Sequence, residues 1–227
     1  MSAVQIPIQQ PPKIYLVHAG VISVDPIAET FSSDWPEARV AHLLEDSLSV
    51  DFNRDGGLTE SMIQRFRKIG DYCAYAGADA ILFTCSMFGQ AIDAVKRDQK
   101  IPVLKPNEAV YDAIMKATGR IVLLSTFEPA LRSMMAEIEE RMAAEGVRPR
   151  IDTHVVAGAV DALYGNRPDE HNRLVAEAVA KFADHDLVAF GQVSMTRALE
   201  LAQKHTRNPI VTTPHSSVKK LKSLIAV

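Results

Sequence analysis

Two stretches decide the fold: Asp79-Ala-Ile-Leu-Phe-Thr-Cys-Ser-Met87 and Asp186-Leu-Val-Ala-Phe-Gly-Gln-Val-Ser-Met195. In each, an Asp precedes a short apolar run that ends in Phe, and a small residue and a polar residue then lead to a Ser-Met pair. This layout is typical of a buried parallel strand that runs into a helix. Two unrelated strand-to-helix joints can resemble each other by chance. We interpret the pair as an internal repeat, in which Cys85 and Gln192 occupy matching positions.

Short apolar runs alternate with longer amphipathic stretches along the rest of the chain, which is typical of a parallel sheet covered by helices. The runs predict strands at residues 14–18, 80–84, 103–104, 121–126, 152–156, 187–190 and 210–212. The amphipathic stretches predict helices at residues 58–76, 129–144 and 216–225. Asp55-Gly56-Gly57 predicts a turn, with Thr59 as an N-cap after it. We therefore expect an α/β fold in which both repeats direct their strand ends at one central cleft, where ligands of open parallel sheets bind.

Cys85 is predicted to lie where a strand ends and a helix begins. The unpaired N–H groups and partial positive charge of a helix N-terminus favour a thiolate, and they also favour a bound carboxylate. We therefore expect the pKa of Cys85 to lie below that of a free thiol, and the hydroxyls of Thr84 and Ser86 to donate to an anion. The alternative interpretation is a buried cysteine that only fills space.

Other polar side chains lie near predicted strand ends, and each has a structural alternative. His18 ends the first strand, where a histidine is often a satisfied structural residue. Ser125 and Thr126 precede a helix, so they either bind a ligand or cap that helix. Capping also explains three residues before the last predicted helix: Thr212, Thr213 and His215.

Cys73 and three acidic residues receive structural interpretations. Cys73 falls on the apolar stripe of the helix at 58–76, which favours core packing. Three acidic loop residues are expected to be solvated: Asp46, Asp51 and Asp55. A Cys-His hydrolase stays open as an alternative, because a histidine near Cys85 could act as its base. The histidines considered for this role are His18, His154 and His215.

The composition narrows the class of protein. The chain has 227 residues, 47% of them hydrophobic, and a net charge of −3 at pH 7. This length suits one large domain or two small lobes, and the charge gives no support for nucleic-acid binding. No basic leader precedes Pro12, and no apolar run approaches the roughly 20 residues of a membrane span. Two cysteines without zinc spacing predict a cytoplasmic protein without a metal site, and glycine-rich phosphate loops and the G-x-S-x-G elbow are absent.

The order of several segments resembles the aspartate/glutamate and hydantoin racemase superfamily. Residues 78–89 resemble its first cysteine motif, residues 186–195 its second, and residues 212–218 its Thr-Pro segment. Ser125-Thr126 resembles the intervening substrate-binding turn, and the resemblance covers the chain from about Lys13 onward. It implies two Rossmann-like lobes with parallel four-stranded sheets, related by pseudo-twofold symmetry around an active-site cleft. The lobes implied are residues 13–106 with 211–227, and residues 107–210.

The resemblance also implies which residues form the site. It implies a cofactor-independent enzyme that holds a small carboxylate with strand-end hydroxyls and amides. The catalytic residue it implies is Cys85, and the assembly it implies is a homodimer or higher homo-oligomer. The expected substrate-binding residues are His18, Thr84, Ser86, Met87, Ser125, Thr126, Gly191, Gln192, Val193, Ser194 and Thr213.

The second motif departs from the family pattern, because Gln192 stands where the family has a second cysteine. Glutamine does not exchange protons near neutral pH, so racemisation by two thiols is not expected. The arylmalonate decarboxylase branch also uses one thiol, but it keeps the second cysteine, whereas this chain keeps the first. Our leading hypothesis is a racemase-like isomerase that acts through Cys85. The alternatives are a one-cysteine decarboxylase, a cis-trans isomerase of a small diacid and a non-catalytic small-acid binding protein.

Overall fold

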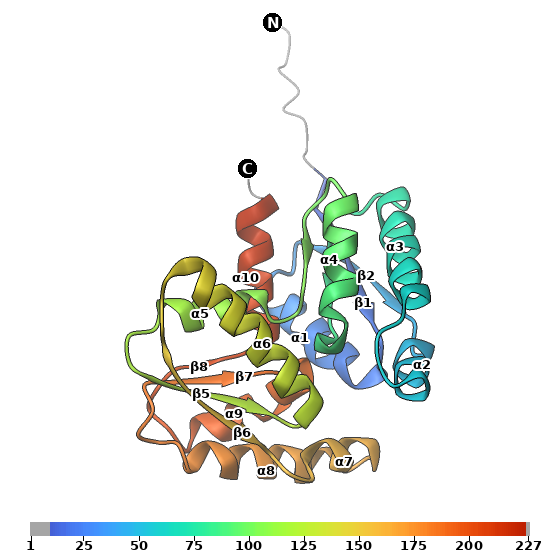
Figure 1. Ribbon diagram of the computed structural model, residues 1–227. Coiled ribbons are helices and arrows are strands. Elements are labelled where there is room, and N and C mark those ends of the chain that lie inside the picture. The colour runs from blue at the N-terminus through green and yellow to red at the C-terminus, as the bar shows by residue number, and fades with distance from the viewer. Residues whose placement is uncertain (1–9, 226–227) are drawn as a thin grey trace, which may run out of the picture.

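The computed structural model describes residues 10–225 and contains two four-stranded parallel sheets (Figure 1). The first sheet, in the order β2-β1-β3-β4, is formed by β1 (Lys13–His18), β2 (Arg39–Leu44), β3 (Ala80–Phe83) and β4 (Val103–Leu104). The second sheet, in the order β6-β5-β7-β8, is formed by β5 (Arg120–Ser125), β6 (Arg150–Val155), β7 (Leu187–Phe190) and β8 (Ile210–Val211). The expected α/β architecture of two similar lobes is confirmed.

Helices flank both sheets (Figure 1). The elements of the first part of the chain are η1 (Val21–Ser23), α1 (Val24–Asp34), α2 (Ser47–Asp55), α3 (Glu60–Tyr75), η2 (Ser86–Phe88) and α4 (Gly89–Asp98), where η denotes a 3-10 helix. The later elements are α5 (Glu108–Lys116), α6 (Glu128–Glu145), α7 (Ala159–Tyr164), α8 (Pro168–Ala180), η3 (Val193–Ala198), α9 (Leu199–Gln203) and α10 (Thr213–Ile225). No helix within residues 10–225 is both long and apolar enough to cross a membrane.

The chain crosses between the lobes before α5 and again before α10, which packs against α1 and α5. We keep residues 13–106 with 211–227, and residues 107–210, as the proposed division into lobes. Residues 226 and 227 of that division lie outside the described residues, as do residues 1–9 of the segment in which a leader was sought.

Two local predictions differ from the structure. Strand β2 was not predicted, because Arg39 and His42 interrupt its apolar pattern and its side chains are partly or fully exposed at the edge of the sheet. Helix α10 begins at Thr213 rather than at residue 216, so Thr213 and His215 belong to the helix and do not precede it. Pro214 fits in its first turn, where a missing N–H breaks no hydrogen bond.

The turn and cap before α3 are confirmed. Gly56 ends α2 with a φ of 72°, in the left-handed region that glycine adopts readily. The side chain of Thr59 then accepts a hydrogen bond from the backbone N–H of Met62 and caps α3.

The Asp that opens each motif makes the same contacts in both lobes. Asp79 accepts a 2.7 Å hydrogen bond from the backbone N–H of Lys13, and Asp186 accepts one of 2.7 Å from that of Arg120. The partners are 66 residues apart in both cases. Each Asp thus ties the first residue of a central strand, β1 or β5, to the strand beside it. This repeated arrangement supports the internal repeat and brings the two motifs to equivalent places.

Candidate active site

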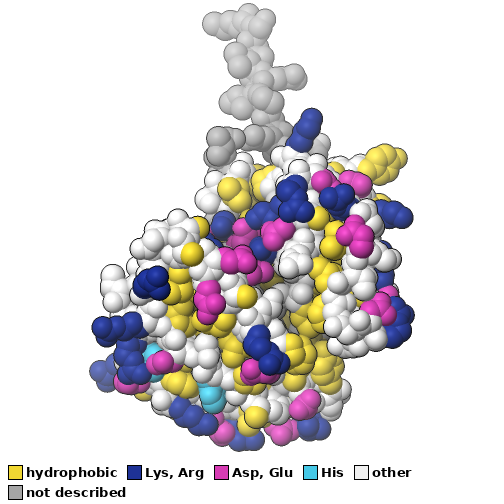
Figure 2. All heavy atoms as spheres, viewed as in Figure 1, with side chains coloured by type: hydrophobic (Ala, Val, Ile, Leu, Met, Phe, Trp, Pro, Cys, Tyr) yellow, Lys and Arg dark blue, Asp and Glu magenta, His cyan; other side chains and the backbone are white. Residues whose placement is uncertain are grey.

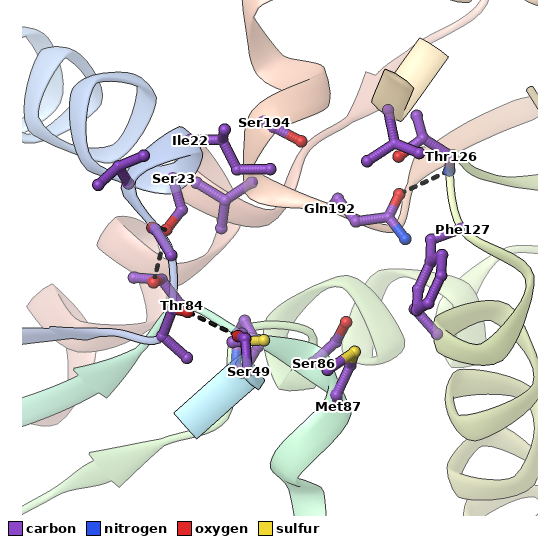
Figure 3. A pocket seen from close by; sticks show the side chains of 18 of the residues that line it. Ile22, Ser23, Ser49, Thr84, Ser86, Met87, Thr126, Phe127, Gln192 and Ser194 are labelled. Atoms are coloured by element: carbon purple, nitrogen blue, oxygen red, sulfur yellow. Dashed lines mark hydrogen bonds between the residues drawn. The ribbon is translucent and has the colours of Figure 1, made fainter. Parts of the chain in front are cut away.

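A cleft of about 720 Å³ lies between the lobes, at the carboxyl ends of the strands. Its walls come from the segments after β1, β3, β5 and β7, together with α2 and α7. The expected site residues that line it are Thr84, Cys85, Ser86, Met87, Thr126, Gly191, Gln192, Val193 and Ser194. Figure 3 shows Ser86 and Met87 on one side of this space and Gln192, Thr126 and Phe127 on another. Nine of the expected site residues thus line one cleft.

Three expected site residues are buried and do not line the cleft: His18, Ser125 and Thr213. Each forms a hydrogen bond to a residue of the wall instead. The Nδ1 atom of His18 lies 2.9 Å from Thr84 Oγ1, and the Ser125 hydroxyl accepts from the Gln192 amide. The hydroxyl of Thr213 donates to Asn107 Oδ1 at 3.2 Å. These buried side chains therefore hold residues that line the cleft in place and do not face the cleft themselves.

Cys85 and Gln192 hold the same position in the two lobes. Cys85 precedes η2 with an extended backbone (φ −115°, ψ 122°), and Gln192 precedes η3 in a similar conformation (φ −126°, ψ 147°). The side chain of Cys85 is half-buried and packs against the apolar cluster that includes Phe66 and Phe83.

The expected lowering of the Cys85 pKa is wrong. Burial removes water from the thiol and raises its pKa, whereas a hydrogen bond from the backbone N–H of Met87 opposes that rise. The Met87 N–H belongs to the short 3-10 helix η2 that follows Cys85, and its hydrogen bond is smaller in effect than the burial. The thiol is therefore the favoured form at neutral pH.

Both ends of the Gln192 side-chain amide form hydrogen bonds within the second lobe. The backbone N–H of Thr126 donates to Gln192 Oε1 at 2.9 Å, and Gln192 Nε2 donates to Ser125 Oγ at 2.6 Å. In Figure 3 the side chain of Gln192 points at Thr126. The Ser125 hydroxyl in turn donates to the carbonyl of Phe127 at 2.9 Å. The Gln192 amide, the Ser125 hydroxyl and the Thr126 N–H thus have hydrogen-bond partners within the protein. The second lobe has a fixed amide where the first lobe has a thiol.

The hydroxyl of Thr84 is engaged behind the wall of the first lobe. It lies 3.0 Å from Ser23 Oγ and donates to the carbonyl of Val17 at 3.3 Å, besides its contact with His18. The Nε2 atom of His18 lies 3.0 Å from His42 Nδ1. Burial and the neighbouring His42 lower the pKa of His18 to about 4, so His18 is neutral at pH 7. Thr84 therefore offers its hydroxyl to this network rather than to a ligand.

Other hydroxyls of the cleft are free to bind. Within residues 10–225, the hydroxyls of Ser86, Thr126 and Ser194 have no hydrogen-bond partner in the protein. They belong to both lobes, and Figure 3 shows the Ser86 and Ser194 side chains directed toward the space between them.

The structure does not support the Cys-His alternative. None of the described residues that line the cleft is a histidine, and His18, which lines a small cavity with Cys85, has its ring nitrogens against Thr84 and His42. His154 packs against Phe182, and His215 lies 2.6 Å from Asp34. Cys73 is fully buried in the core, as expected, and burial raises its pKa to about 12. Within residues 10–225, no three His, Cys, Asp or Glu side chains gather closely enough to hold a metal ion.

Of the three acidic candidates, only Asp46 lines the cleft. Asp51 and Asp55 belong to α2, where each pairs with Arg54 at 2.7 Å. Their charges are therefore used in surface ion pairs.

Sequence reasoning missed several residues of the cleft. Residues 20–23 come after β1, and Phe127 comes after β5, the first strand of the second lobe. Extending the internal repeat to the first strand of each lobe would have identified these residues. Asn107 follows β4 at the crossing between the lobes. Tyr164 lies at the end of α7, away from any strand end, and the sequence carries no signal for it.

The family model described as Asp/Glu/Hydantoin racemase matches residues 58–221. A glutamate racemase from Bacillus anthracis has a similar structure, with 14% sequence identity, a TM-score of 0.72 and coverage of 96% of this chain and 83% of that one. The aspartate racemase of Picrophilus torridus is 11% identical, with a TM-score of 0.72 and coverage of 95% of this chain and 94% of that one. A variant of arylmalonate decarboxylase is 16% identical, with a TM-score of 0.62 and the same two coverages. No curated protein matches the chain in sequence. The structural similarities agree with the two-lobed fold.

Proposed function

The chain belongs to the Asp/Glu/hydantoin racemase family, and we propose that it is a racemase-like isomerase that transfers a proton at the carbon next to a substrate carboxylate through one thiol, that of Cys85. The observation that carries the proposal is the unequal pair at the two strand ends. Cys85 lines the cleft in the first lobe, and Gln192 takes the matching position in the second.

The proposed reaction needs one acid/base group on one face of the substrate. As a thiolate, Cys85 takes the proton from the carbon next to the carboxylate, and the electron pair left there spreads into the carboxylate as an enediolate. The hydroxyls of Ser86 and Ser194 are available to donate to the enediolate oxygens. The thiol then returns a proton to the same face. Inversion requires a proton from the other face, which water must supply because the amide of Gln192 does not exchange protons.

The raised pKa of Cys85 favours a second candidate, the decarboxylation of a substituted malonate. In that reaction the bond to one carboxylate breaks, CO2 leaves, and its electron pair enters an enediolate. The Cys85 thiol donates its proton to the carbon and regains one from water. A thiol that is protonated at neutral pH already has the form that this step requires.

Proton exchange in deuterated water tests the proposal. Amino acids, hydroxy acids, hydantoins and substituted malonates are incubated with the protein, and NMR follows the loss of the α-proton and the release of CO2. We expect turnover with wild type and with Cys73→Ala, which keeps the cleft intact, and none with Cys85→Ala. Equal behaviour of wild type and Cys85→Ala would contradict the proposal. Thermal stabilisation by an acid that survives Cys85→Ser, without turnover, would indicate a binding protein.

The proposal includes expectations about partners and location. The substrate is a small carboxylate, no cofactor or metal takes part, and neither nucleic acid nor a membrane is a partner. The protein acts in the cytoplasm as a homodimer or higher homo-oligomer, and light scattering of the purified protein tests the assembly.

A further inference from the structure

Acidic side chains line the cleft, and basic ones are absent among its described residues. None of the described residues that line it is Lys, Arg or His, whereas Asp46 beside α2 and Asp161 on α7 both line it. Neither carboxylate takes part in a salt bridge within residues 10–225. A ligand with a second negative charge would therefore meet like charges without any opposite charge to compensate them.

Exposed apolar side chains gather at the same place. Nine large hydrophobic side chains are exposed within residues 10–225. Four of them line the cleft: Val21 (61% exposed), Val50 (66%), Phe127 (37%) and Tyr164 (74%). They come from both lobes, and Figure 2 shows hydrophobic side chains along the junction between the lobes. Apolar surface that remains exposed around a concave site is typical of a surface that contacts a ligand.

A free donor follows the thiol directly in the first lobe, whereas Gln192 takes up part of the matching place in the second lobe. In the second lobe, Gln192 occupies the N–H of Thr126 and the hydroxyl of Ser125. In the first lobe, the Ser86 hydroxyl is free and follows Cys85 directly. The donors beside Cys85 thus suit the carboxylate next to the reacting carbon, and the second lobe offers neutral hydroxyls but no cation among the described lining residues.

We propose that the cleft selects acids whose side group is apolar and rejects acids whose side group ends in a second carboxylate, such as aspartate and glutamate. This inference rests on the proposed function, because it uses the same site. The carboxylate lies beside Cys85 and Ser86, and the side group packs on the apolar rim that includes Val50, Phe127 and Tyr164.

Pairs of acids with the same shape test this selectivity. An isopropyl group and a carboxylate are similar in size and outline, so 4-methylpentanoate pairs with succinate, and leucine pairs with aspartate. Binding to the wild-type protein is measured by calorimetry and by ligand-observed NMR, neither of which requires turnover. We expect the apolar member of at least one pair to bind at least tenfold more tightly. Equal or tighter binding of the diacids, or no binding of any of these acids, would overturn the inference.

A charge placed on the rim provides the second test. Val50 is exposed, so Val50→Lys should fold normally, and it adds the cation that the cleft lacks. We expect it to tighten succinate binding at least fivefold relative to 4-methylpentanoate binding, because it adds a cation and removes part of the apolar rim. Leu224→Lys changes an exposed residue of α10 outside the cleft and should alter neither. An unchanged preference in Val50→Lys would count against the inference. Selective binding of the apolar acids without proton exchange or CO2 release would contradict the proposed function and leave the selectivity standing.

Discussion

The side-chain amide nitrogen of Gln192 donates a 2.6 Å hydrogen bond to the hydroxyl of Ser125. The oxygen of the same amide accepts the N–H of Thr126, so both ends of the side chain are fixed to the end of β5. An amide held in this way acts as part of the wall. The place that matches Cys85 in the second lobe is therefore occupied by a group that neither gives nor takes protons.

The substitution Gln192→Cys should convert one-sided proton transfer into racemisation. It places a thiol at the position that matches Cys85, and it frees the backbone N–H donor of Thr126 and removes the hydrogen bond that the Ser125 hydroxyl accepts. With an enantiopure substrate in deuterated water, we expect wild type to exchange the α-proton faster than it inverts the centre. In Gln192→Cys the two rates should approach each other. NMR measures exchange, and chiral chromatography measures inversion.

Gln192→Ser is the matched control for this experiment. It removes the same two hydrogen bonds without adding a thiol, so it should not gain racemisation. Both variants should lose about 1–3 kcal/mol of unfolding free energy, because partly buried partners lose their hydrogen bonds. A ratio of exchange to inversion that stays at the wild-type value in Gln192→Cys argues against one-sided chemistry.

The alkylation of Cys85 should report its raised pKa. Only the thiolate reacts with iodoacetamide, so in Cys73→Ala the rate should increase about tenfold per pH unit between pH 7 and pH 9. At pH 7 it should be slower than the rate of a free cysteine derivative. Mass spectrometry of the intact protein follows the reaction. A rate that reaches its plateau below pH 8 would show that the helix start outweighs burial.

The fold was predictable where the sequence pattern is strong. The strands around Ile81 and Val188 are buried on both faces, so their residues form continuous apolar runs. Strand β2 lies at an edge and carries Arg39 and His42, and such a strand lacks an apolar run. Its place in the sheet depends on pairing with β1, which is a long-range contact that no local pattern encodes.

The site was predictable in position but not in its electrostatics. The repeat placed Cys85 and Gln192 in the same cleft, because parallel strands end at the same edge. It did not show that Phe66 and Phe83 back the thiol, and this packing determines the direction of the pKa shift. The hydrogen bond from the Gln192 amide to the Ser125 hydroxyl likewise depends on the distance between two side chains, which only the folded chain sets.

The buried histidine behind Thr84 should make stability depend on pH. The pKa of His18 is lowered from 6.5 to about 4, so the unfolded chain binds the proton more readily than the folded one. His18 therefore destabilises the folded state progressively as the pH falls from 6.5 to 4, and the effect approaches about 3 kcal/mol below that range. Urea denaturation at pH 7.5, 5.5 and 4.5 measures this loss.

His18→Gln should reduce the loss, because glutamine does not titrate. His205→Gln changes an exposed histidine and serves as the control. The remaining slope should come from other histidines whose pKa burial also lowers, such as His154 and His171. If wild type and His18→Gln lose the same stability between pH 7.5 and pH 4.5, His18 does not remain neutral in the folded protein.

Asp79 and Asp186 should contribute equally to the stability of their lobes. Each carboxylate accepts a 2.7 Å hydrogen bond from the first backbone N–H of a central strand, that of Lys13 or Arg120. Both side chains lie at the surface, so we expect Asp79→Ala and Asp186→Ala each to lower the unfolding free energy by about 1 kcal/mol. The corresponding Asn variants keep an oxygen acceptor and should lose less than half of that. Urea denaturation of the four variants at pH 7.5 provides the comparison. A loss confined to one lobe would show that the repeated contact has the same geometry in both lobes without the same energetic weight.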